Sequence, residues 1–209
     1  MMVRRIGWVS MGVAVMCLPL VAVAETNATG LERYEQRFAG SAPAAYRSAE
    51  PAFEITVPQN VQGWSIKTRQ VKQSPFAFFK STASKLPFIS TSIDFLAEMS
   101  PDIQAMWGEP EKLFASKTSS DKQFEKQTLP DVVFVSEKQT TVAGLPALDR
   151  VYRSEHSGVT YHSVYVLFRE ALVTFGLNAF TASFNYDDAD FLAILGTLKK
   201  IEGNWRRPK

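Results

Sequence analysis

The stretch from residue 131 to residue 201 constrains the fold most, because its hydrophobic pattern changes period along its length. It opens with a continuous apolar run at residues 132–135, which is typical of a strand covered on both faces. Two alternating segments follow at residues 145–153 and 159–168, joined by a short polar loop that contains Gly158. A glycine in a short loop between alternating segments predicts an antiparallel hairpin.

The rest of this stretch predicts one more strand and a terminal helix. A tight turn near residues 169–170 leads into an apolar segment at residues 172–177. Along residues 159–168, alternate side chains point to opposite faces, and we expect both faces to be at least half buried. Closer to the C-terminus, apolar residues recur at three- and four-residue steps, which indicates a helix lying on the sheet. These residues are Phe191, Ile194, Leu195, Leu198 and Ile201.

Residues 1–24 have the composition of an export signal. Arg4 and Arg5 form a positive first region, an apolar run follows at residues 9–23, and Ala22-Val23-Ala24 matches a cleavage site. An uncleaved membrane anchor is the alternative, but the apolar run is shorter than the roughly 20 residues of a spanning helix. The sequence therefore predicts a periplasmic or secreted protein with no stable membrane span after cleavage.

Removal of this signal changes the charge balance and removes the thiol. The chain has 23 basic and 21 acidic residues, so loss of Arg4 and Arg5 leaves 21 of each. A balanced charge gives no electrostatic footprint for nucleic acid, which is therefore not an expected partner. The one cysteine, Cys17, lies within the signal. The mature chain is therefore predicted to lack disulfides, cysteine nucleophiles and cysteine metal ligands.

The mature chain divides into three parts by composition. Residues 25–51 are polar and alanine-rich, which indicates a linker or a loosely packed arm, although apolar residues between 31 and 38 have the spacing of a short helix. Residues 52–203 have the length of a single α+β domain. Residues 204–209 form a basic tail that is typical of a solvated chain end.

The first part of the domain predicts strands and then helical segments. Ser100, Pro101 and Asp102 form a favourable helix start, because serine caps, proline suits the first position and an acid suits the helix dipole. Pro110 breaks or restarts that helix, and the polar residues 111–127 carry few apolar anchors. Strands are expected at 53–57, 64–71, 76–80 and 88–95.

Several short motifs occur across the domain in a distinctive order. They are Phe-x-Ile-x-Val-Pro at 53–58, Gly63-Trp64, Gly144-Leu145-Pro146-Ala147, the alternating strand at 161–168, and Asp190-Phe191 followed by Ile194-Leu195. In this order they resemble the PsbP-like fold group, which includes bacterial envelope relatives such as DcrB. The resemblance covers residues 53–201 and implies a twisted antiparallel sheet flanked by helices. It also implies a mostly non-enzymatic binding or assembly module, and residues 74–128 depart from its compact pattern.

The two histidines are the first candidates for catalysis, because nucleophilic hydrolysis needs a base beside a nucleophile and an orienting acid. His162 shares a strand face with apolar residues, which favours a partly buried histidine over a catalytic base. His156 lies in the expected hairpin loop, where a solvated turn residue is the simpler interpretation. Two histidines six residues apart do not form a recognised zinc spacing. The sequence thus assigns no catalytic, metal-binding or cofactor-binding residue.

Two further groups of residues could have either a ligand-binding or a structural role. Asp187, Asp188 and Asp190 could offer oxygen ligands to calcium, but they lack the glycine and terminal glutamate of an EF-hand, and stabilisation of a helix start is favoured. Trp64 and Trp107 could line a groove for a peptide, lipid or partner. Packing of these tryptophans at the edges of the core is the simpler interpretation.

The predicted function is an exported, non-catalytic binding or assembly module of the bacterial cell envelope, with another envelope protein as its partner. Two alternatives stay open: a periplasmic hydrolase or isomerase that uses scattered carboxylates and His162, and a carrier with a small-ligand pocket between sheet and helix. An exposed groove with His162 beside an acid would favour the enzyme, whereas His162 packed under the terminal helix would contradict it. Function is expected in residues 74–128 or in the arm, rather than in residues 131–201.

Overall fold

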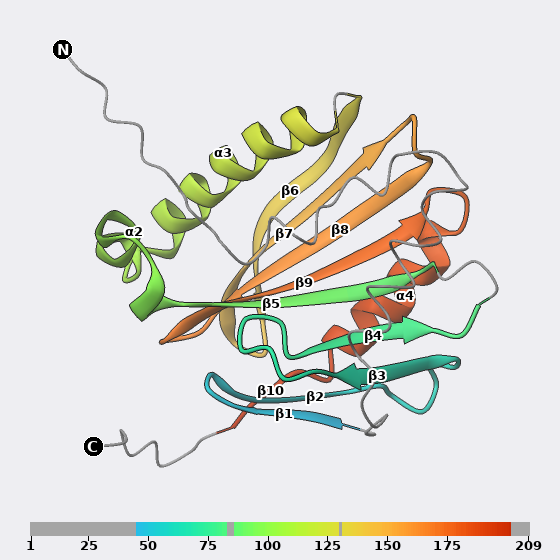
Figure 1. Cartoon of the computed structure of the whole chain (residues 1–209), viewed down its shortest axis with the longest axis horizontal. Helices are drawn as coiled ribbons and strands as arrows, with labels where there is room; N and C mark the ends of the chain where they lie inside the picture. Colours follow the sequence, from blue (N-terminus) through green and yellow to red (C-terminus); the bar gives the residue numbers. More distant parts are fainter. Residues whose placement is uncertain (1–44, 83–85, 130, 202–209) are drawn as a thin grey trace.

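A computed structural model of the 209-residue chain describes residues 45–82, 86–129 and 131–201. They form an α+β fold with two antiparallel sheets and flanking helices (Figure 1). The large sheet has the strand order β3-β4-β5-β9-β8-β7-β6, and the small sheet has the order β1-β2-β10. The strands are β1 (Ala45–Ala49), β2 (Ala52–Thr56), β3 (Trp64–Thr68), β4 (Phe76–Lys80), β5 (Phe88–Phe95), β6 (Val132–Val142), β7 (Leu145–Ser154), β8 (Val159–Leu167), β9 (Ala171–Phe180) and β10 (Lys199–Lys200). The helical segments are η1 (Leu96–Glu98), α2 (Pro101–Met106), α3 (Pro110–Thr128) and α4 (Phe184–Leu195).

Successive strands from β6 to β9 pair as neighbours, and their turns have the backbone conformations that hairpins need. Ala143 and Gly144 join β6 to β7 with positive φ angles of 53° and 75°. Two positive φ angles match the right-handed twist of paired strands. Gly158, with φ of 62°, lies in the loop that brings Ser154 opposite Val159. The predicted hairpin between residues 145–153 and 159–168 is therefore confirmed.

The two faces of the large sheet pack against different elements. Along β8, Val164 and Val166 face one apolar core, whereas Tyr165 and Leu167 face another. The first core includes buried residues of α4 and β2, and Figure 1 shows α4 lying across the strands. The second core includes buried residues of α2 and α3. Both faces of this strand are therefore buried, as its pattern predicted.

The polar middle segment forms one long helix, α3, which begins at Pro110 as predicted. Leu113 and Phe114 near its start are fully buried against the sheet, and Phe124 is half buried. Ser100 stands at the start of α2, but its side chain makes no capping hydrogen bond. Helix α3 is therefore held by a few apolar anchors and by polar contacts that the sequence pattern did not predict.

Two predictions about exposure and helix length are wrong. Residues 132–135 were expected to be covered on both faces, but β6 is an edge strand on which Val133 is 39% and Val135 is 54% exposed. The terminal helix ends at Leu195, and the chain then turns to place β10 against β2. Buried packing of Leu198 outside the helix produced the misleading three- and four-residue spacing.

The expected arm, residues 25–51, overlaps the first described strand. Residues 45–49 form β1, which pairs with β2 and brings Tyr46 opposite Ile55. Residues 1–24, the greater part of the arm and the tail at 204–209 lie outside the described residues. Within the described ranges, no helix has the length and apolar content required to cross a bilayer.

Candidate binding groove

His162 of β8 lies beneath α4, between two acidic residues. Its Nε2 is 3.0 Å from Oδ1 of Asp149 on β7, and its Nδ1 contacts the carboxylate of Asp188 on α4. The ring packs edge-on against Phe191, with ring centroids 4.9 Å apart, and the residue is only 3% exposed. This position under the terminal helix contradicts the hypothesis that His162 is a solvent-accessible catalytic base.

The two carboxylates keep this histidine protonated. Burial alone would lower the pKa of His162, but the hydrogen bonds with Asp149 and Asp188 raise it to about 9. Burial alone would raise the pKa of Asp149, yet the contact with His162 leaves it below its ordinary value. A charged imidazolium held between one acid on the sheet and one on the helix fastens α4 to the sheet.

The other two acids of α4 also accept hydrogen bonds from particular side chains. Asp187 accepts from Ser183 Oγ at 2.7 Å and from Lys80 Nζ at 3.0 Å. Asp190 accepts from Lys80 Nζ at 2.8 Å and from Trp64 Nε1 at 2.9 Å. Asp187 lies in the first turn of α4, as a stabilising acid should, but these acids also link the helix to β3 and β4.

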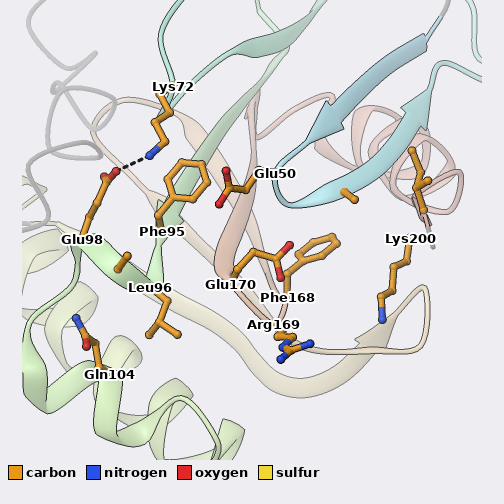
Figure 2. A pocket seen from close by; sticks show the side chains of 13 residues that line it. Glu50, Lys72, Phe95, Leu96, Glu98, Gln104, Phe168, Arg169, Glu170 and Lys200 are labelled. Atoms are coloured by element: carbon orange, nitrogen blue, oxygen red, sulfur yellow. Dashed lines mark hydrogen bonds and ion pairs between the residues drawn. The ribbon is translucent and has the colours of Figure 1, made fainter. Parts of the chain in front are cut away.

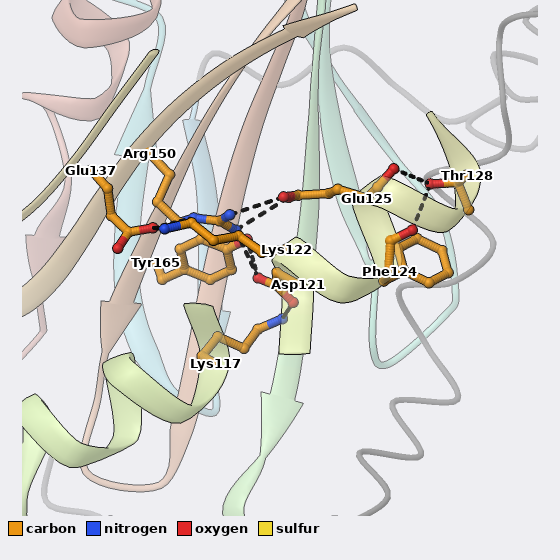
Figure 3. A network of polar contacts seen from close by, with 9 residues as sticks. All are labelled: Lys117, Asp121, Lys122, Phe124, Glu125, Thr128, Glu137, Arg150 and Tyr165. Atoms are coloured by element: carbon orange, nitrogen blue, oxygen red, sulfur yellow. Dashed lines mark hydrogen bonds and ion pairs between the residues drawn. The ribbon is translucent and has the colours of Figure 1, made fainter. Parts of the chain in front are cut away.

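A second polar cluster, here called the Arg150 cluster, lies between α3 and the sheet (Figure 3). Arg150 of β7 is 1% exposed and donates to both carboxylate oxygens of Glu125, at 3.2 and 2.9 Å. It also donates to Asp121 at 3.1 Å and to Glu137 at 3.2 Å. Tyr165 donates to Asp121 at 2.7 Å from the neighbouring strand. Every group of this cluster thus has a partner of suitable charge or polarity.

The pKa values in the Arg150 cluster follow from burial and close pairing. Burial raises the pKa of Glu125, and the nearby Arg150 only partly offsets it. The pKa of Tyr165 is well above its ordinary value, because burial and the adjacent Asp121 both oppose its ionisation. Arg150, Glu125 and Tyr165 are buried and every group is engaged by another member of the cluster, so the cluster holds α3 in place rather than offering a site to a ligand.

An open groove lies at one end of the molecule, and its volume is about 830 Å³ (Figure 2). Six segments line it: the turn between β1 and β2, the loop between β3 and β4, the end of β5 with the residues that follow it, α2, the turn between β8 and β9, and β10 with the residue that follows it. This volume is within the range of about 300–1,000 Å³ that is usual for ligand sites.

The floor of the groove is apolar. Phe95 and Phe168 lie at the ends of β5 and β8 and are 5% and 3% exposed. Leu96 is half buried, and Ile201 is 38% exposed. Phe168 also packs against Phe53 of β2, with ring centroids 5.5 Å apart, so the floor is continuous with the main core.

Charged side chains surround this floor. Lys72 donates to Glu98 at 2.7 Å and lies 4.0 Å from the centre of the Phe95 ring, and the hydrogen bond from Lys72 lowers the pKa of Glu98. The four other charged side chains have no hydrogen bond or ion pair with any described residue. They are Glu50, Arg169, Glu170 and Lys200. The groove therefore keeps two acids and two bases available to a ligand.

Neither of the tryptophans considered as groove residues lines this groove. Trp107 lies at the end of α2, and its Nε1 donates to the backbone carbonyls of Phe168 at 3.2 Å and Arg169 at 2.9 Å. It thereby holds the β8–β9 turn, which supplies part of the groove. Trp64 is 8% exposed and bonds Asp190 at a distant edge, as packing at the core edge would predict.

Sequence patterns could not reveal this groove, because its residues share no motif and come from positions between 50 and 201. It combines the end of the expected arm, the middle segment and the stretch from residue 131 to residue 201. Within the described residues, no group of three or more His, Cys, Asp or Glu side chains is arranged to hold a metal ion.

No protein-family model matches the sequence, and no curated protein matches it significantly. The structure, however, is similar to solved structures. The solution structure of cyanobacterial PsbP (CyanoP) from Synechocystis sp. PCC 6803 matches with a TM-score of 0.51 and 12% sequence identity, over 78% of this chain and 96% of that chain. The fold is PsbP-like.

A second solved structure is also similar to this chain. LpqN of Mycobacterium tuberculosis, described as involved in cell envelope biogenesis, is similar with a TM-score of 0.49 and 16% identity, over 74% of this chain and 88% of that chain. The predicted α+β class and the predicted PsbP-like resemblance are confirmed. Because folds host unrelated functions, the PsbP-like fold does not by itself identify what the groove binds.

Proposed function

We propose that this protein is an exported, non-catalytic binding module of the bacterial cell envelope, and that the groove is its binding surface for another envelope protein. The observation that carries this proposal is the combination of an apolar floor with four charged side chains that lack partners among the described residues. Such charges stay solvated until a ligand of complementary charge arrives, and the apolar floor favours burial of that ligand.

The other candidate chemistry in the molecule is already engaged. His162 is buried and held as a cation by Asp149 and Asp188, so it is a poor proton acceptor at neutral pH. The carboxylates of the Arg150 cluster are all paired with Arg150. These contacts favour binding over the hydrolase or isomerase alternative.

The proposed location rests on the sequence. Residues 1–24 have the positive start, the apolar run and the small-residue end of an export signal. A mature chain without cysteine also suits an oxidising compartment, because it carries no thiol that could form unwanted disulfides.

Site-specific photo-crosslinking in cells tests this proposal. A photoreactive phenylalanine analogue is placed at Ala97, which lines the groove, or at Ala115, an exposed position on α3. A discrete crosslinked envelope protein is expected from position 97 and not from position 115. The crosslink should weaken about tenfold when Arg169→Glu and Lys200→Glu are combined.

A matched control carries the same charge change outside the groove. Lys126→Glu with Lys199→Glu alters two exposed lysines, on α3 and on β10, that do not line the groove. This control should retain the crosslink. Equal crosslinking from both positions, or full retention by the groove variant, would place binding elsewhere. A small molecule that co-purifies without any protein would support the carrier alternative.

A further inference from the structure

The backbone of β10 has an open edge beside the groove. Among the described strands, β10 pairs with β2 on one side only. Ile201 N donates to Ala52 O at 3.0 Å, and Lys200 stands opposite Phe53. Backbone groups of successive residues in an antiparallel strand point alternately to its two sides. The N–H and C=O groups of Lys200 therefore point away from β2, toward the open edge.

The open edge and the groove lie at the same place, because Lys200 and Ile201 also line the groove. Exposed strand edges are sites at which an extended chain can add as a further strand. A chain that pairs with Lys200 would place alternate side chains over the groove. Main-chain hydrogen bonds would then supply affinity, and the groove would select the side chains.

The charges of the groove require a ligand that carries both signs. With Lys72 paired to Glu98, two acids and two bases remain, and a ligand of one sign would meet repulsion from half of them. In the view of Figure 2, Glu50, Glu170 and Arg169 lie around Phe168, while Lys200 lies to one side. A ligand that carries both a positive and a negative group would satisfy the acids and the bases.

We propose that the groove binds an extended peptide segment that pairs with the open edge of β10. The segment presents an apolar side chain to Phe95 and Phe168, a basic side chain to Glu50 and Glu170, and an acidic side chain to Arg169 and Lys200. This inference rests on the proposed function and names its ligand class. A lipid tail would cover the apolar floor but would leave the backbone groups of Lys200 without partners.

Fluorescence anisotropy with three synthetic peptides tests the charge requirement. Each fluorescein-labelled peptide has a Val-Thr-Phe-Thr-Val centre, flanked by lysine and glutamate, by two lysines, or by two glutamates. The mixed-charge peptide is expected to bind the exported protein about tenfold more tightly than either single-sign peptide. Combining Arg169→Glu with Lys200→Glu should reverse this preference toward the two-lysine peptide, whereas Lys126→Glu, on α3, should leave it unchanged.

A backbone-methylated version of the mixed-charge peptide tests strand pairing. Methylation on alternate amides blocks addition to a strand edge but keeps every side chain, so we expect about a tenfold loss of affinity for one methylation register and little loss for the other. Equal affinity of both registers would overturn pairing with β10. Equal affinity of all three charge patterns would overturn the charge requirement.

Phosphatidylethanolamine vesicles form the final arm of the test. Cosedimentation that depends on Arg169 and Lys200, without peptide binding, would assign the groove to a zwitterionic lipid surface instead. If position 97 still crosslinks an envelope protein while no peptide binds, the ligand class is wrong but the binding function stands.

Discussion

The Arg150 cluster and the groove rim contain the same kinds of charged side chain, but burial gives them opposite properties. Arg150 is 1% exposed and reaches three carboxylates, so its charge is satisfied within the fold. Arg169 is exposed on the groove rim and has no side-chain partner among the described residues. The comparison shows that clustered charge alone does not identify a binding site. Charged side chains that have no partner and lie beside an apolar groove are a better indication of a binding site than clustered charge.

The free-energy consequences of the two regions also differ. Removing one partner of a buried ion pair leaves the other charge desolvated and uncompensated, which costs several kcal/mol. A solvated charge on the groove rim can be removed with little effect on folding. Substitutions in the two regions should therefore separate stability from binding.

The largest expected effect is from Arg150→Ala. This change leaves Glu125 without its buried counter-charge, whereas Asp121 keeps its ion pair with Lys117, so the free energy of unfolding should fall by about 3–5 kcal/mol. Urea unfolding followed by tryptophan fluorescence measures this loss. Lys126→Ala, at an exposed position near the end of α3, should change stability by less than about 0.5 kcal/mol. A loss below about 1 kcal/mol for Arg150→Ala would show that the cluster is open to water.

The next effect is a pH dependence caused by His162. Its pKa is raised from the ordinary value of 6.5 to about 9. Its contribution to the free energy of unfolding is therefore fully present below pH 6.5 and is lost as pH rises to about 9. The shift corresponds to a stability change of about 3 kcal/mol across this window. Urea unfolding at several pH values measures it, and His162→Asn should flatten the profile. An unchanged slope in that variant would assign the dependence to another group.

The smallest effect on folding is expected from combining Glu50→Gln with Glu170→Gln in the groove. Neither side chain has a partner within the described part of the chain, so the free energy of unfolding should change by less than about 0.5 kcal/mol. Binding of the mixed-charge peptide should nevertheless weaken about tenfold. Unfolding and anisotropy measurements on the same preparation compare the two quantities. A large loss of stability would mean that these acids belong to the fold, as those of the Arg150 cluster do.

Much of the fold could be predicted because its elements depend on local patterns. The alternation in residues 159–168 identified β8, and Pro110 marked the start of α3. The limits of α4 could not be predicted in the same way, because Leu198 is buried by packing outside the helix and still continues its spacing. Exposure of β6 also depends on strand order, which periodicity does not record.

The polar sites were predicted less well, since partners distant in sequence decide their roles. The predicted role of Asp187 in stabilising the start of α4 is only part of its role, because Asp187 also accepts a hydrogen bond from Lys80 on β4. Burial of His162 was anticipated from its strand face, but its two carboxylate partners were not. No local signal pairs Arg150 with Glu125, which lies 25 residues earlier on a helix.

The sequence by itself determined the order of most strands and helices, the burial of strands such as β8 and the expectation of export. These properties depend on the period and composition of short segments, which the chain carries wherever it folds. Only the tertiary structure decided which charges are satisfied and which stay open to a ligand. Desolvation and pairing depend on the distance between groups in space, and that distance is set when the two sheets and the helices pack together.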